Sequence, residues 1–108
     1  MIQAQFFKAG SILTGCEVSG HAEYGDAGED IVCAAVSSAV QTVSNLITEI
    51  YKLPARVHAD PDTATISIQV EAEASGVDSH NLLSGLALQL SQIQEEYPAC
   101  ITIKYVEV

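Results

Sequence analysis

Residues 30–52 read DIVCAAVSSAVQTVSNLITEIYK, and this stretch decides the fold. Its apolar residues recur every three or four positions, a spacing that predicts one long helix. They are Val32, Val36, Ala39, Val40, Val43, Leu46, Ile47 and Ile50. No charged residue stands between Asp30 and Glu49, and the residues at 34, 35, 37 and 38 are small. We therefore expect a helix that is buried on more than one side and that ends before Pro54.

The segments before this helix have the pattern of a β-hairpin followed by a loop. Residues 2–7 and 12–19 predict two strands, because both are rich in apolar and β-forming residues. The tripeptide Ala9-Gly10-Ser11 between them is a turn signal. Residues 20–29 carry three glycines and are predicted to form a loop.

Four elements are predicted after the first helix: strands at 55–59 and 63–73, a helix over 78–96 and a strand at 100–108. Asp78 or Ser79 can cap the second helix. The element order is therefore ββαββαβ. This order predicts a single α+β domain over residues 1–108, a compact two-layer sandwich of two helices against a mostly antiparallel sheet.

The composition indicates a soluble, cytoplasmic domain. The three cysteines, Cys16, Cys33 and Cys100, are odd in number and far apart, which favours reduced thiols over a disulfide framework. Residues 1–8 lack the charged lead and apolar stretch of a signal peptide. We expect no membrane span, because no apolar run approaches the ~20 residues that one needs.

The charge of the chain limits its partners. Fourteen acidic residues against four basic ones give a formal net charge of −10. A surface of that sign repels phosphate backbones, so direct binding to nucleic acid is not expected. A basic protein or peptide would instead be attracted. Charge alone leaves open that the acidity serves only solubility.

Candidate catalytic residues gather in residues 20–37, GHAEYGDAGEDIVCAAVS. Cys33 falls in the first turn of the predicted helix, where free backbone N–H groups and the helix dipole favour thiolate over thiol. A thiolate can attack an acyl carbon, and the same N–H groups can stabilise the oxyanion that results. His21 stands twelve residues earlier, and the glycine-rich loop is long enough to bring its imidazole to the sulfur. We predict a Cys–His pair, although a buried helical cysteine and a surface histidine would produce the same spacing.

Asp30 and Ser37 each have two possible roles. As the helix N-cap, Asp30 would accept a hydrogen bond from the backbone N–H of Cys33. Alternatively, its carboxylate orients the imidazole of His21, as the third member of a triad does. Ser37 stands one helical turn after Cys33, so it is either a polar group near the site or a small packing residue.

These residues resemble the signature of a known family. The elements are Gly20-His21-Ala22, a glycine-rich loop, and Gly28-Glu29-Asp30-Ile31-Val32-Cys33-Ala34-Ala35-Val36-Ser37. Together they resemble the ribosomal-processing cysteine proteases, the Prp or YsxB-like family. The resemblance covers nearly the whole chain, since its length and element order also agree.

The resemblance implies a specific activity. Members of this family remove a short N-terminal extension from a bacterial large-subunit ribosomal protein, number twenty-seven, after a Gln-Phe-Phe-like motif. It implies Cys33 as nucleophile, His21 as base and acid, and Asp30 as a supporting residue. Gly20, Gly28 and Ser37 are further candidates for residues near the site. The resemblance also implies a homodimer and a basic substrate protein that suits the acidic chain. We expect no metal or other cofactor.

Two other classes of protein fit parts of the sequence. A zinc deaminase shares the His21-Ala22-Glu23 element, but its Pro-Cys-x-x-Cys partner is missing because Val32 and Val36 stand at the proline and second cysteine positions. A non-catalytic ribosome-assembly adaptor would hold a basic ribosomal protein on an acidic surface. Such an adaptor would keep its function without the Cys33 thiol.

Overall fold

The computed structural model describes residues 1–20 and 27–108, and for residues 27–30 it describes the backbone alone. Within this part of the chain the element order is ββαββαβ, as predicted. The elements are β1 (Ile2–Ala9), β2 (Ile12–Ser19), α1 (Ala27–Asn45), β3 (Ala55–Asp60), β4 (Thr65–Val70), α2 (Val77–Glu96) and β5 (Ile101–Glu107). The predicted α+β class is confirmed.

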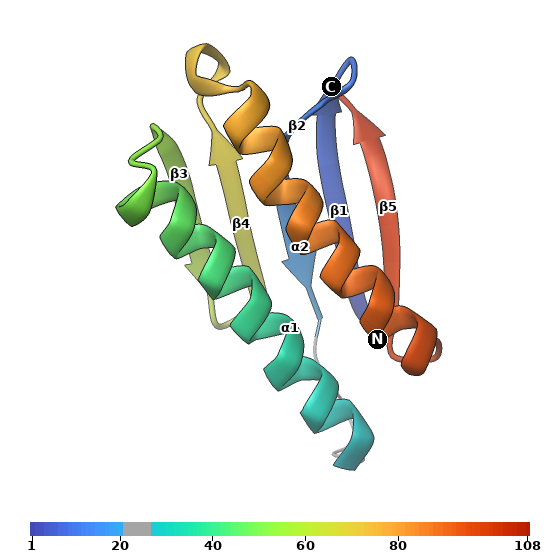
Figure 1. The fold of residues 1–108 in the computed structure, drawn as a ribbon. Helices are drawn as coiled ribbons and strands as arrows, with labels where there is room; N and C mark the ends of the chain where they lie inside the picture. Colours follow the sequence, from blue (N-terminus) through green and yellow to red (C-terminus); the bar gives the residue numbers. More distant parts are fainter. Residues whose placement is uncertain (21–26) are drawn as a thin grey trace.

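The described strands form one sheet, and both helices lie on the same face of it (Figure 1). The strand order is β3-β4-β2-β1-β5. The pairs β1–β2, β2–β4 and β3–β4 are antiparallel, whereas β1 and β5 are parallel. The first and last strands of the chain are therefore neighbours, which a mostly antiparallel sheet permits.

The core lies between the sheet and the helices. Residues of neighbouring strands that are paired across the sheet share a face, because side chains alternate along a strand. Phe6 of β1 is paired with Cys16 of β2 and Tyr105 of β5, and Cys16 is paired with Ile68 of β4. Phe6, Cys16 and Ile68 are fully buried under the helices.

α1 begins earlier than the sequence indicated. The helix starts at Ala27 and not at Asp30, which excludes the N-cap, the first of the two roles considered for Asp30. Acidic residues are favourable throughout the first turn of a helix, so an aspartate there does not show at which residue the helix begins. Cys33 therefore lies in the second turn, where its own N–H belongs to the helix. The free N–H groups of the first turn lie one turn before it.

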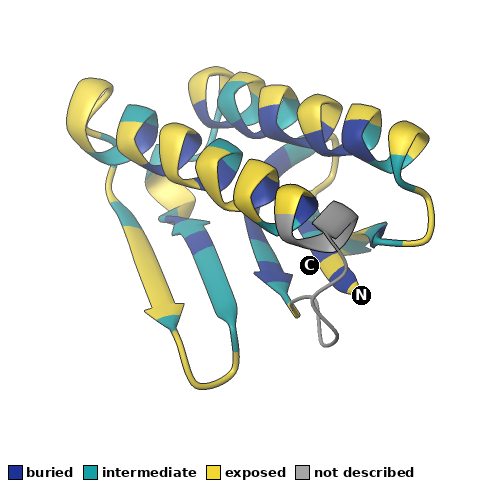
Figure 2. Ribbon diagram, turned by 90° about the horizontal axis from the view of Figure 1, so that it is seen from below, coloured by how far each residue is buried: buried dark blue, intermediate teal, exposed yellow. Residues whose placement is uncertain are grey.

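α1 is buried on one side only. Its buried residues are Val32, Val36, Val40, Val43 and Ser44, and Ile47 follows in a π-helical turn, Leu46–Ile50. Ala34, Ala35, Ser37 and Ser38 are exposed. The prediction of burial on several sides was wrong, because no layer of the described chain covers the outer face of the helices (Figure 2).

The same helix contradicts the expectation that no apolar stretch of the chain approaches the length of a membrane span. Residues 31–50 are long and apolar enough to cross a membrane by length and composition, with a mean hydropathy of 1.5. The core helix of a globular protein can meet the same criterion. The buried apolar side chains of this stretch recur every three or four residues, as in such a core helix.

The start of α2 also differs from the prediction. The helix begins at Val77, so its N-cap is Gly76 and not Asp78 or Ser79. Ser79 acts three residues further in, where its Oγ accepts a hydrogen bond from the Gly76 N–H at 2.9 Å. Leu83, Leu86 and Leu90 of α2 are buried in the core, whereas Val77 and Leu88 are exposed.

Candidate active site

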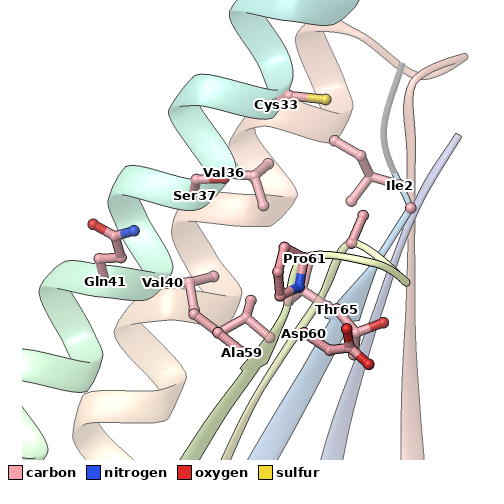
Figure 3. Close-up of a pocket in the computed structure, with 14 residues that line it drawn as sticks. Ile2, Cys33, Val36, Ser37, Val40, Gln41, Ala59, Asp60, Pro61 and Thr65 are labelled. Atoms are coloured by element: carbon pink, nitrogen blue, oxygen red, sulfur yellow. The ribbon is translucent and has the colours of Figure 1, made fainter. Parts of the chain in front are cut away.

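Cys33 lies at the mouth of a groove between α1 and the β3–β4 hairpin. Its side chain is partly buried and packs against the edge of the core. The second turn of α1 directs the sulfur away from the helix and toward the strands, on the side where Ile2 lies (Figure 3). The thiol is thus held by a helix and faces a cavity, where a bound substrate could reach it. A nucleophile needs such a position.

The groove is apolar and has the size of a ligand site. Its volume is about 560 Å³, within the range typical of ligand pockets. The residues that line it come from α1, from the ends of β1 and β2, and from the hairpin: Ile2, Val18, Gly20, Cys33, Val36, Ser37, Val40, Gln41, Ala59, Asp60, Pro61, Ala64, Thr65 and Ile66. Figure 3 shows Asp60 and Thr65 with their oxygen atoms directed away from α1, so the wall opposite Cys33 is largely hydrocarbon.

Gly20 fixes the chain next to the predicted base. Its φ of +94° and the nearby Met1 carbonyl oxygen, which a Cβ would strike, leave room for glycine alone. Its N–H donates to the Ala64 carbonyl at 3.2 Å. Gly20 lines the same groove as Cys33. His21, the following residue, lies outside the described residues, so the Cys–His pair stays a prediction.

Two of the other predicted site residues are placed by the backbone of α1. Gly28 and Asp30 both lie in its first turn, one turn before Cys33. Ser37, one turn after Cys33, is exposed and lines the groove. Its position favours a polar group near the site over a residue of a tight packing contact.

The comparisons with known proteins decide the family. Residues 1–102 match the family described as cysteine protease Prp. The chain belongs to this family. It is therefore a cysteine protease. A comparison with curated proteins found no match.

Solved structures of similar fold agree with this membership. SMU.848 from Streptococcus mutans is 29% identical, with a TM-score of 0.88 over 100% of this chain and 96% of the other. The essential ribosomal processing protease Prp from S. aureus, in complex with a covalently linked product peptide, is 24% identical, with a TM-score of 0.84 over 98% of this chain and 100% of the other. The same protease in complex with a substrate peptide is 23% identical, with a TM-score of 0.87 over the same shares.

The other two cysteines pack in or against the core. Cys16 is fully buried in β2, and Cys100 is partly buried against the core. Burial raises the pKa of the Cys16 thiol to about 12. At neutral pH Cys16 is therefore an unreactive thiol.

A second pair of residues resembles a nucleophile and its base, and geometry excludes that role. Ser84 Oγ lies 3.5 Å from Nε2 of His80, on the α2 side of the molecule. However, the backbone N–H of Leu13 donates to Nδ1 of His80 at 3.1 Å. The neutral imidazole thus carries its proton on Nε2 and cannot accept one from Ser84.

Sequence reasoning missed most of the groove. Gln41 follows Ser37 by the same four-residue step that separates Ser37 from Cys33. The helical spacing could therefore have predicted the groove residues of α1. It could not have predicted those of the hairpin, because Pro61 and Ile66 reach the site only through the β2–β4 pairing.

Proposed function

We propose that this protease removes the N-terminal extension of a large-subunit ribosomal protein, number twenty-seven, during bacterial ribosome maturation. One observation carries the proposal: the Cys33 thiol opens on an apolar groove of about 560 Å³ in a chain of the Prp family. The S. aureus protein of similar fold is a ribosomal processing protease. An apolar groove suits the aromatic residues that precede the cut in the Gln-Phe-Phe-like motif.

The proposed mechanism is acyl transfer through a Cys33–His21 pair. The Cys33 thiolate attacks the scissile carbonyl carbon, and the tetrahedral intermediate collapses as the C–N bond breaks and the His21 imidazolium protonates the leaving amine. Water then attacks the remaining thioester as His21 takes its proton, and the C–S bond breaks, which releases the carboxylic acid and restores the Cys33 thiolate. Asp30, one turn before Cys33 on α1, is proposed to orient His21.

The charge and surface of the chain support a basic partner and a dimer. The net charge of −10 attracts a basic ribosomal protein and speeds encounter at low salt. The outer face of α1 exposes Ala34, Ala35 and Ser38 and has no charge between Asp30 and Glu49, so we propose it as the homodimer contact. We place the enzyme in the cytoplasm, where this substrate is made, with no cofactor and no direct contact to nucleic acid or membrane.

The dimer contact is tested by sedimentation or light scattering. The wild type is expected to sediment as a dimer, and Ala35→Glu, which adds a charge at the centre of the proposed face, as a monomer. A monomeric wild type would show that the dimer proposal is wrong.

The processing role is tested with a synthetic precursor peptide that carries the Gln-Phe-Phe-type extension. We expect cleavage after the aromatic pair by the wild type, and a loss of about 10³-fold or more with Cys33→Ala or His21→Ala, because either change removes the nucleophilic pair. Circular dichroism on each variant checks that the fold is kept. A Cys33→Ala variant that still cuts the peptide would rule the mechanism out.

The adaptor function remains the alternative, favoured only by the acidity of the chain. It predicts that Cys33→Ala replaces the wild type without loss in cells. The protease predicts that Cys33→Ala still binds the precursor but leaves its extension uncut.

A further inference from the structure

α1 presents three polar side chains in a row along the groove. Cys33, Ser37 and Gln41 stand four residues apart, and all three line the cavity. Residues at this spacing lie on one side of a helix, one above the other. Val36 and Val40 are buried beside the row and form the apolar floor. Figure 3 shows Cys33, Ser37 and Gln41 following one another along the α1 ribbon.

The row has the length of a short extended peptide. Eight residues of α-helix separate Cys33 from Gln41, and their rise is about 12 Å. An extended peptide advances about 3.3 Å per residue. If its scissile carbonyl lies at Cys33, a peptide running along α1 brings its third or fourth residue from the cut beside Gln41.

The Gln41 side chain is free to make that contact. It is exposed at the far end of the groove, and within the described part of the chain its amide forms no side-chain hydrogen bond. The neighbouring Thr42 differs, because its hydroxyl donates to the Ser38 carbonyl at 2.9 Å. An amide offers both a donor and an acceptor, and the main chain of an extended peptide needs both.

We infer that Gln41 is a positioning residue for the substrate, which hydrogen-bonds the main chain three or four residues before the cut. The inference rests on the proposed function, since it takes the apolar residues that precede the cut to occupy the groove. Gln41 does not touch the reacting atoms. It fixes the register of the peptide, so that the carbonyl following the aromatic residues is the one that reaches Cys33.

The experiment compares Gln41→Ala with the wild type on precursor peptides that keep five, four or two residues before the cut. For the two longer peptides we expect KM to rise about three- to tenfold with kcat nearly unchanged, as loss of one neutral hydrogen bond in substrate binding predicts. For the peptide with two residues before the cut, the variant and the wild type should be equal, because the peptide no longer reaches position 41.

Gln89→Ala is the matched control. Gln89 is exposed on α2 and does not line the groove, so the same chemical change there should leave KM and kcat as in the wild type. Equal kinetics of Gln41→Ala and wild type on every peptide would overturn the inference, as would a rise in KM independent of peptide length. Peptides that the wild type leaves uncut would instead overturn the proposed function, and the inference with it.

Discussion

The two halves of the sheet differ in how far the helices cover them. Under α2, the side chains of Phe6, Leu90 and Ile101 are completely buried. At the other edge, Val57 of β3 belongs to the helix-facing side by its pairing with Ile68, yet it is 41% exposed. Figure 2 shows β3 exposed along most of its length, whereas the inner sides of both helices are buried.

This difference teaches where stability and function lie. The half under α2 uses most of its apolar side chains for the core. It also holds a pocket of about 510 Å³, lined by Leu88 and Tyr105 among others, which contains none of the predicted site residues. The hairpin half leaves apolar surface open beside Cys33, and a groove of that kind gains affinity when a peptide covers it. The predictions below test this division, from the largest effect to the smallest.

The largest effect is expected in the half of the sheet under α2, called the closed half below. Leu90→Ala should lower the free energy of unfolding by about 2–5 kcal/mol, because it leaves a cavity among fully buried side chains. Val57→Ala should lower it by no more than about 0.5 kcal/mol, as for a surface change. Urea unfolding of both variants measures the difference. Equal losses would mean that the hairpin packs as tightly as α2.

Gly20→Ala should destabilise the groove half. Alanine at φ +94° is strained, and its Cβ would strike the Met1 carbonyl. Gly10→Ala is the control, because Gly10 has φ +64° with nothing within 4 Å. We expect Gly20→Ala to cost about 1–3 kcal/mol more than Gly10→Ala by urea unfolding. If Gly10→Ala costs as much, the contact with Met1 has no energetic role.

Cys16 should make the closed half sensitive to alkaline pH. The pKa of its thiol is raised to about 12 by burial, so the unfolded chain releases this proton first as the pH rises. Stability is then complete below the unfolded pKa and falls between about pH 9 and pH 12, by up to about 1.4 kcal/mol per pH unit. Urea unfolding at pH 8 and pH 10.5 tests this against Cys16→Ala, which should lack that part of the slope. Identical slopes would contradict it.

The smallest effect is a gain. Gly85 lies inside α2, and a Cβ there would meet nothing within 4 Å. Gly85→Ala should therefore raise the free energy of unfolding by about 0.5–1 kcal/mol through helix propensity, with peptide cleavage unchanged. Thermal unfolding detects the gain. A loss of stability would show that this face of α2 is already in contact with another surface.

The sequence predicted the parts of the fold that neighbouring residues encode. The three- and four-residue spacing of Val32, Val36 and Val40 predicted the inner face of α1, and the pattern of residues 63–73 predicted the strand that became β4. The start of α1 was missed because Asp30 has the residue type of a cap. The parallel pairing of β1 with β5 could not be predicted, since it depends on residues about a hundred positions apart.

For the site, too, local spacing predicted what lies on one helix and could not predict what distant segments contribute. Cys33 and Ser37 are one helical turn apart, so local spacing was enough to place both on one wall of the groove. The opposite wall comes from the hairpin, whose distance from α1 is set by the whole sheet. The role of His21 stays a prediction, which rests on the spacing and on the resemblance to the family.

The pairing of the first strand with the last has a consequence for how the chain is made. β1 lies between β2 and β5, and the N–H of Ile2 donates to the carbonyl of Cys100 at 2.8 Å. A ribosome adds about 5–20 residues per second, so roughly 5–20 s pass between the synthesis of β1 and that of β5. Throughout that interval one edge of β1 has no partner strand. The nascent chain is then open to pairing with other chains.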